Sequence, residues 1–94
     1  MTAYVLHAAS TAEEALDVHG LTVDEALPAV TAFLDRAFVA GNRRVRIVHG
    51  KGTGRLRRAV WQALAKAEFV EGFRYAEPHE GSYGATVVDL APRS

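Results

Sequence analysis

The hydrophobic and polar positions in the first half of the chain predict a short strand followed by an amphipathic helix. Residues 16–20 alternate apolar and polar side chains and end on glycine, which is typical of a strand that stops at a turn. Thr22 and Glu25 have the spacing of a capping box, and apolar residues recur behind them at helical intervals until Gly41 should end the helix. Pro28 removes one backbone donor from this helix, but the period continues after it, so we predict a single helix.

The second half of the chain predicts a strand, a helix and two further strands. Apolar residues lie between arginines over 45–48, and a glycine-rich loop over 50–54 leads into a helix whose apolar face spans 56–64. Residues 70–76 and 85–90 have the composition of two more strands, with turn residues between them. The predicted order of elements is therefore βαβαββ.

This order predicts the fold class and the domain boundaries. Strand–helix–strand repeats favour a parallel start to the sheet, and the last two strands can close it antiparallel. We therefore expect an α/β (α+β) two-layer sandwich, in which two helices pack on a four-stranded mixed sheet. With 94 residues the chain has room for one small domain, which we place at 15–91, between a leader or linker over 1–14 and a tail over 92–94.

The composition excludes several classes of protein. The chain has no cysteine, so a disulfide scaffold, a thiol nucleophile and a cysteine zinc site are excluded. Its apolar runs are only a few residues long, far shorter than a membrane span, and its first residues lack the pattern of a secretory signal. Hydrophobic residues make up 49% of the chain, which is enough for a globular core. We expect a cytoplasmic domain without a membrane partner.

The charges are divided unevenly along the chain, although they sum to zero. Nine of the 11 Lys and Arg residues lie between Arg36 and Lys66, and all 11 acidic residues lie outside that stretch. A basic segment of this kind favours a polyanion such as DNA or RNA as a partner. The alternative is that folding mixes the two signs again over the surface.

Three polar residues lie where the first two strands should end. Asp17 and His19 are two positions apart, so on a strand both side chains would face the same side, and His49 closes the second strand. In a parallel sheet these strand ends lie at one edge, so we expect the three side chains to converge. An aspartate can orient an imidazole, and a histidine can move a proton near neutral pH, so all three are candidate catalytic residues. The alternative for Asp17 and His19 is a cap-and-turn role.

The glycine-rich loop has the features of a phosphate site. Its alternating glycines allow a ligand to approach the backbone, and the loop opens a helix whose N-terminal amides attract anions. The pattern matches neither the ATP-binding P-loop nor the dinucleotide fingerprint. A flexible turn is the alternative, although basic residues flank the loop. The residues that we expect to bind phosphate are Gly50, Lys51, Gly52, Thr53, Gly54, Arg55, Arg57 and Arg58.

Two further groups extend this predicted surface. Arg43, Arg44 and Arg46 lie at the start of the second strand, and we expect them to enlarge the basic surface, with a solvated loop as the alternative. Tyr83 lies in a glycine-flanked loop, where its ring is a candidate for stacking on a base. Trp61 is expected to pack in the core or at its edge.

Three segments together resemble the Smr (small MutS-related) domain. In the order and spacing of that family they are Leu16-Asp17-Val18-His19-Gly20, His49-Gly50-Lys51-Gly52-Thr53-Gly54 and Gly81-Ser82-Tyr83-Gly84-Ala85-Thr86. The resemblance runs from about Leu16 to Leu90 and is closest to the C-terminal Smr domain of the bacterial MutS paralogue that acts in recombination control and ribosome rescue. Two positions depart from the family pattern, since Val18 replaces a leucine and Ser82 stands where a second glycine is usual.

The resemblance implies a fold like the C-terminal domain of translation initiation factor three, binding of DNA or RNA, and often endonuclease activity. By position, Asp17 and His19 match a signature implicated in cleavage, and His49, Gly50 and Gly52 match one implicated in nucleic-acid binding or catalysis. We therefore expect an endonuclease of low sequence specificity that nicks DNA, RNA or both. Asp17 is a candidate ligand for a divalent metal ion such as Mg²⁺ or Mn²⁺. The alternatives are a non-catalytic module of a larger MutS-like ATPase that binds nucleic acid or the ribosome, and a domain that tethers such an ATPase to a protein.

Overall fold

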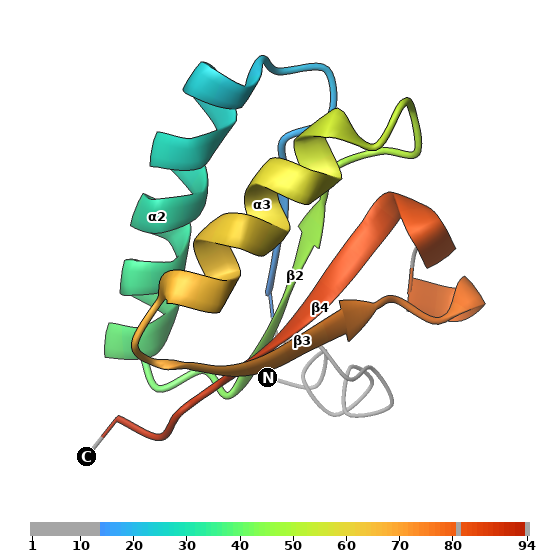
Figure 1. The fold of residues 1–94 in the computed structure, drawn as a ribbon. Coiled ribbons are helices and arrows are strands. Elements are labelled where there is room, and N and C mark those ends of the chain that lie inside the picture. Colours follow the sequence, from blue (N-terminus) through green and yellow to red (C-terminus); the bar gives the residue numbers. More distant parts are fainter. Residues whose placement is uncertain (1–13, 81, 94) are drawn as a thin grey trace.

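The computed structural model describes residues 14–80 and 82–93, and within them the predicted order of elements is confirmed (Figure 1). The elements are β1 (Glu14–Asp17), α2 (Val23–Val39), β2 (Arg44–Val48), α3 (Arg55–Lys66), β3 (Val70–Tyr75), the 3₁₀ turns η1 (Pro78–Glu80) and η2 (Ser82–Gly84), and β4 (Ala85–Leu90). The leader or linker predicted for 1–14 lies outside the described residues except for Glu14, as does the last residue of the predicted tail. Within the described part of the chain, neither helix is long and apolar enough to cross a membrane.

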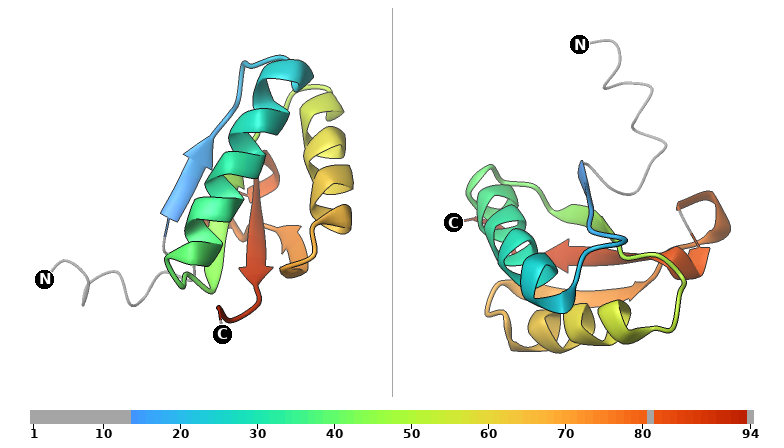
Figure 2. Two further views of the ribbon diagram at one scale, coloured as in Figure 1. Left: turned by 90° about the vertical axis from the view of Figure 1, so that its left-hand side faces the viewer. Right: turned by 90° about the horizontal axis from the view of Figure 1, so that it is seen from above.

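The strands form one mixed sheet in the order β1-β2-β4-β3. β1 pairs with β2 in parallel, and β4 runs antiparallel to both of its neighbours. Both helices cover the same face of the sheet, so the domain has two layers, which confirms the predicted fold class (Figures 1 and 2). The register places Val48 opposite Ala85, so the loop after β2 meets the loop before β4.

The core lies between the helices and the sheet. The sheet contributes these fully buried residues to it: Val45, Ile47, Val88 and Leu90. They meet apolar residues of both helices, including Val30 and Leu34 of α2 and Val60 and Leu64 of α3. Because side chains alternate along a strand, the neighbouring positions of β2 and β4 point to the face that the helices leave open.

The start of α2 is held by the predicted capping box. The Thr22 hydroxyl accepts a hydrogen bond from the Glu25 N–H at 3.2 Å, and the Glu25 carboxylate accepts one from the Thr22 N–H at 3.0 Å. The helix then continues through Pro28, which lies on its exposed side. The prediction of a single helix is therefore confirmed.

The first strand lies earlier in the chain than its pattern predicts. β1 covers Glu14–Asp17, whereas the alternation of apolar and polar residues indicates 16–20. Val18 is buried although it follows the last strand residue, and this burial extends the alternating pattern beyond the strand. His19 and Gly20 then form a turn, with Gly20 at a φ of 84° that glycine adopts readily.

Candidate active site and nucleic-acid interface

Asp17 and His19 form a hydrogen-bonded pair at the end of β1. The Nδ1 atom of His19 lies 2.5 Å from Oδ1 of Asp17, and the His19 backbone N–H donates to the same oxygen at 3.0 Å. The hydrogen bonds from the ring and from the backbone lower the pKa of the Asp17 carboxyl, so this group is an ionised acceptor at neutral pH. The proton between them therefore belongs to Nδ1, which leaves Nε2 to face a ligand on a side chain that is 66% exposed.

This contact depends on the turn rather than on a shared strand face. An aspartate that accepts a hydrogen bond from the N–H two residues later closes a small turn, and here that turn brings the His19 ring back onto Asp17. The predicted partnership of the two side chains is found, with a different local geometry from the one that the alternating pattern suggests.

The Asp17–His19 pair lies beside the glycine-rich loop. The Val18 N–H donates to the Val48 carbonyl at 2.8 Å and so ties the end of β1 to the end of β2. A Cβ atom on Gly50 would lie only 3.2 Å from the Cβ of His19, and Gly50 has a φ of 81°. Glycine at position 50 therefore meets two requirements, the left-handed backbone and the close approach of His19.

A cleft of about 540 Å³ lies between the loop after β1 and the loop after β2. Residues 20–24 line one wall, and residues 49–57 line the other. The lining begins at the residue after His19, so the Asp17–His19 pair borders the cleft instead of lying inside it. The volume falls within the range of sites for small organic ligands.

The two helices that begin at this cleft differ in charge. α2 is capped by Thr22 and has Asp24 and Glu25 in its first turn. α3 follows Gly54, and has neither a side-chain cap nor an acidic residue in its first turn. Basic residues surround its start instead, and none of them forms an ion pair with another described residue: Lys51, Arg55, Arg57 and Arg58. The start of α3 is therefore the part of the cleft that most favours an anion.

His49 is separated from Asp17 and His19 by burial. Its side chain is only 4% exposed, with Nε2 at 2.8 Å from the Thr86 hydroxyl and Nδ1 at 2.9 Å from the Gly50 carbonyl oxygen. Burial lowers the pKa of His49 despite the hydrogen bond to Gly50, so the ring is neutral at neutral pH. Asp17 and His19 are thus exposed partners, whereas alternation along β2 turns the His49 ring towards the helices.

The loop before β4 supports the glycine-rich loop. The Gly84 carbonyl accepts hydrogen bonds from the N–H groups of His49 and Gly50, both at 2.9 Å. A Cβ atom on Gly84 would lie 3.5 Å from Cγ of Lys51, so these two loops are in contact. Ser82 has a φ of 56°, in the left-handed region that favours glycine. The loop therefore adopts a glycine-like turn although serine occupies this position.

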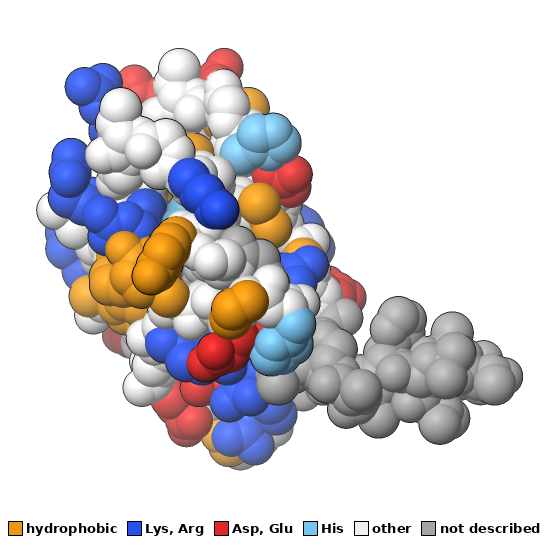
Figure 3. All heavy atoms as spheres, turned by 90° about the vertical axis from the view of Figure 1, so that its right-hand side faces the viewer, with side chains coloured by type: hydrophobic (Ala, Val, Ile, Leu, Met, Phe, Trp, Pro, Cys, Tyr) orange, Lys and Arg blue, Asp and Glu red, His pale blue; other side chains and the backbone are white. Residues whose placement is uncertain are grey.

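Aromatic side chains pack beside the start of α3. The ring centres of Trp61 and Tyr75 are 5.0 Å apart, and those of Tyr75 and Tyr83 are 5.3 Å apart. The guanidinium carbon of Arg57 lies 5.5 Å from the centre of the Trp61 ring and 5.6 Å from that of Tyr75. Figure 3 shows hydrophobic and basic side chains gathered side by side on this face. No motif in the sequence marks Tyr75, although the period of two in β3 places it on the same face as Phe73, which also packs on Trp61.

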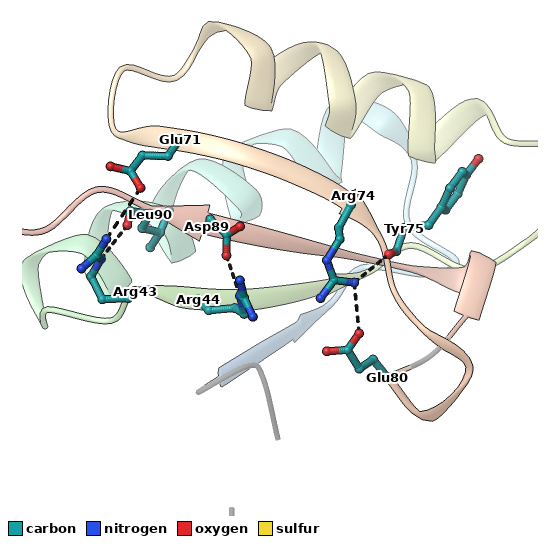
Figure 4. A network of polar contacts seen from close by, with 8 residues as sticks. All are labelled: Arg43, Arg44, Glu71, Arg74, Tyr75, Glu80, Asp89 and Leu90. Atoms are coloured by element: carbon teal, nitrogen blue, oxygen red, sulfur yellow. Dashed lines mark hydrogen bonds and ion pairs between the residues drawn. The ribbon is translucent and has the colours of Figure 1, made fainter. Parts of the chain in front are cut away.

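Arg43, Arg44 and Arg46 lie on a different surface from the glycine-rich loop. Arg43 and Arg44 are at the opposite end of β2, and Arg46 points to the face of the sheet away from the helices. All three guanidinium groups have partners on neighbouring segments, which are Glu71, Asp89 and the backbone carbonyl of Glu80, respectively. Figure 4 shows the first two of these contacts. These arginines therefore lie apart from the glycine-rich loop, on a surface where folding mixes the two signs of charge, and their contact with nucleic acid stays a prediction.

The described residues contain no cluster of three potential metal ligands. Over 14–80 and 82–93, no three His, Asp or Glu side chains lie close enough together to hold a metal ion. Oδ1 of Asp17 already accepts two hydrogen bonds from His19, and the nearly buried Glu80 pairs with Arg74 on another surface.

The sequence matches the family model of the Smr domain over residues 16–91, which include all three motifs. The chain belongs to the Smr domain family. An Endonuclease MutS2 from Pelotomaculum thermopropionicum is 50% identical over 76 residues, which are 81% of this chain and 10% of that protein. An Endonuclease MutS2 from Thermotoga neapolitana is 42% identical over 84 residues, which are 89% of this chain and 11% of that protein. This Smr domain therefore spans about a tenth of the length of these curated relatives.

Solved Smr structures have the same fold. The Smr domain of Thermus thermophilus MutS2 matches with a TM-score of 0.82 and 46% identity, over 85% of this chain and 100% of that chain. YdaL, a stand-alone small MutS-related protein from Escherichia coli, matches with a TM-score of 0.80 and 27% identity, over 97% of this chain and 76% of that chain. The predicted family and its resemblance to the Smr domain of MutS proteins are confirmed.

Proposed function

We propose that this Smr domain binds nucleic acid and cleaves its phosphodiester backbone with little dependence on sequence. The observation that carries the proposal is the Asp17–His19 pair, in which a carboxylate holds an exposed imidazole at 2.5 Å on the border of a basic cleft. The name of the relatives, Endonuclease MutS2, supports the same class of reaction.

The cleft supplies the contacts that a nucleic-acid backbone needs. A phosphate at the start of α3 would receive hydrogen bonds from backbone N–H groups of the first turn and attraction from Lys51 and Arg55. Contacts of this kind recognise the charge of the backbone and not the identity of the base, which accounts for low sequence specificity.

His19 would transfer protons in the cleavage step. Its Nε2 atom removes a proton from the attacking hydroxyl, and the imidazolium then returns a proton to the leaving oxygen as the phosphorus–oxygen bond breaks. The attacking hydroxyl is the neighbouring 2′-hydroxyl on RNA and a water molecule on DNA. Asp17 keeps the proton on Nδ1 and stabilises the positive charge that forms on the ring. The amides of the glycine-rich loop and Lys51 would stabilise the negative charge that develops on the phosphate.

A cleavage assay on DNA and RNA of matched sequence, with and without a chelator, tests this function. The parent domain should cleave at least one substrate, and His19→Ala should abolish cleavage while its affinity for the oligonucleotide stays within about twofold. His79→Ala removes another exposed histidine, in η1, and should cleave like the parent. Undiminished cleavage by His19→Ala would refute the mechanism.

The same geometry supports a second function, non-catalytic binding of nucleic acid. Asp17 accepts the backbone N–H of His19 as well as its ring, so it also stabilises the turn at the end of β1. A binding module would show salt-dependent affinity and no product from either substrate, with or without the chelator. The cleavage assay separates the two functions.

A further inference from the structure

We propose that Tyr83 and Tyr75, together with Arg57, form a stacking platform for an unpaired base of single-stranded nucleic acid. The phosphate next to that base would lie at the start of α3. The inference rests on the proposed function, because it specifies the type of strand that the cleft accepts.

The two tyrosines present aromatic surface to solvent. Tyr83 is 67% exposed and Tyr75 is 37% exposed, and their rings meet edge to face with an angle of 81° between their planes. Tyr75 is in turn supported by Trp61, whose indole N–H donates to the buried hydroxyl of Thr86 at 2.8 Å. Tyr75 is therefore anchored in the core, and the ring of Tyr83 packs against it.

The platform is linked to the phosphate site by the backbone. Tyr83 directly precedes Gly84, whose carbonyl holds the N–H groups of His49 and Gly50 at the start of the glycine-rich loop. Tyr83 is thus one residue away from the group that supports the glycine-rich loop.

Arg57 joins the two sites through its side chain. It lines the cleft, and its guanidinium group also lies over the rings of Trp61 and Tyr75. Its charge therefore favours a backbone phosphate on one side and the π surface of the platform on the other. Positive charge beside exposed aromatic rings fits a nucleic-acid strand better than an apolar protein surface.

Stacking on the platform requires a base that is not already stacked on adjacent bases. Bases in a duplex are already stacked, so a single strand, a loop or a frayed end is the matching ligand. Every base has a π face, so a stacking platform is as tolerant of sequence as the phosphate contacts are.

Binding of a fluorescent single-stranded oligonucleotide tests the platform. All proteins carry His19→Ala so that the strand stays intact. Tyr83→Ala should weaken affinity by about 5- to 100-fold, and Tyr83→Phe, which keeps the ring, should bind like the parent. Val39→Ala is the matched control, because Val39 is 57% exposed at the far end of α2 and should have no effect. An abasic strand of the same charge should bind weakly, and Tyr83→Ala should not weaken it further.

The outcome separates the platform from the nuclease. Equal affinity of Tyr83→Ala and the parent for the intact strand would overturn the platform, as would tight binding of the abasic strand or no measurable binding by the parent. If Tyr83→Ala weakens binding but the domain without His19→Ala cleaves nothing, the platform stands and the nuclease fails. Cleavage that depends on His19 together with no effect of Tyr83→Ala gives the reverse conclusion.

Discussion

The hydroxyl of Thr86 lies 2.8 Å from Nε2 of His49 and also 2.8 Å from Nε1 of Trp61, so one buried oxygen joins β4, the end of β2 and α3. The indole N–H can only donate, so the hydroxyl accepts from Trp61 and donates its own proton to His49. The Nδ1–H group of His49 then donates a hydrogen bond to the Gly50 carbonyl oxygen. A neutral His49 with its proton on Nδ1 fits this chain of donors and acceptors, in agreement with the pKa that burial lowers. The ring thus contacts the glycine-rich loop from inside the core.

Thr86→Val should destabilise the domain by about 1–3 kcal/mol, because it leaves the buried ring of His49 and the partly buried indole N–H of Trp61 without this partner. The change in the free energy of unfolding can be measured by urea denaturation. Thr86→Ser keeps the hydroxyl and is the control, with a smaller loss from the missing methyl group. Equal losses for valine and serine would show that the hydroxyl does not matter.

The stability of the domain should fall as the pH drops below about 6.5. Burial lowers the pKa of His49 in the folded state, whereas the unfolded chain has the ordinary value. Between these two pKa values His49 is protonated in the unfolded state but not in the folded state, so the free energy of unfolding rises with pH. Below the folded pKa both states are protonated, and the stability that the neutral His49 contributes is fully lost. Asp17 contributes to the pH dependence of stability only below about pH 4. Hydrogen bonds from His19 lower the pKa of its carboxyl in the folded state, so the stability that this carboxylate contributes is lost as the pH falls through that range.

Urea denaturation between pH 5 and pH 8 measures this dependence. His49→Gln should flatten the profile in that range even if it lowers stability overall, and His79→Ala should keep the slope of the parent. A His49→Gln profile as steep as that of the parent would assign the effect to another group.

Gly54→Ala should disturb the start of α3 and reduce affinity for nucleic acid. Gly54 has a φ of 86°, and a Cβ atom there would lie 3.1 Å from Nη2 of Arg57, a lining residue of the cleft. We expect a loss of about 1–2 kcal/mol in unfolding free energy from the left-handed backbone. Gly72→Ala is the control, because no atom lies within 4 Å of the added Cβ in β3, and it should change stability by less than about 0.5 kcal/mol. Equal effects of the two substitutions would contradict this account.

Neutralising the basic residues of the cleft should reduce the salt dependence of binding. Lys51→Gln and Arg55→Gln should each lower the slope of log affinity against log salt by about 1, because each removes a phosphate contact. Arg44→Gln removes a charge of the same sign that is paired with Asp89 at the other end of β2, so the slope should not change. The measurement is a titration of one labelled oligonucleotide at several salt concentrations. A change in slope for Arg44→Gln as large as that for Lys51→Gln would mean that both surfaces bind.

Periodicity was sufficient to predict the order of the elements, because the apolar faces of α2 and α3 and the strands of the sheet have distinct repeats. The capping box at Thr22 and Glu25 is equally predictable from the sequence, since it depends on residues three positions apart. The Asp17–His19 contact was predicted as a partnership, but its geometry depends on a turn that alternation cannot reveal.

Contacts between distant segments depend on the register of the strands, which the hydrophobic pattern does not determine. The pairing of Arg44 with Asp89 joins residues 45 positions apart and depends on how β4 inserts beside β2. The contact of Tyr75 with Tyr83 likewise depends on how the end of β3 lies against η2. Neither contact leaves a local signal in the sequence.

Only one of the two helices at the cleft brings negative charge to its own first turn. A strand bound as we propose would be repelled by the acidic first turn of α2 and attracted by the basic start of α3. Walls of unequal charge therefore set which side of the cleft the sugar–phosphate backbone would follow.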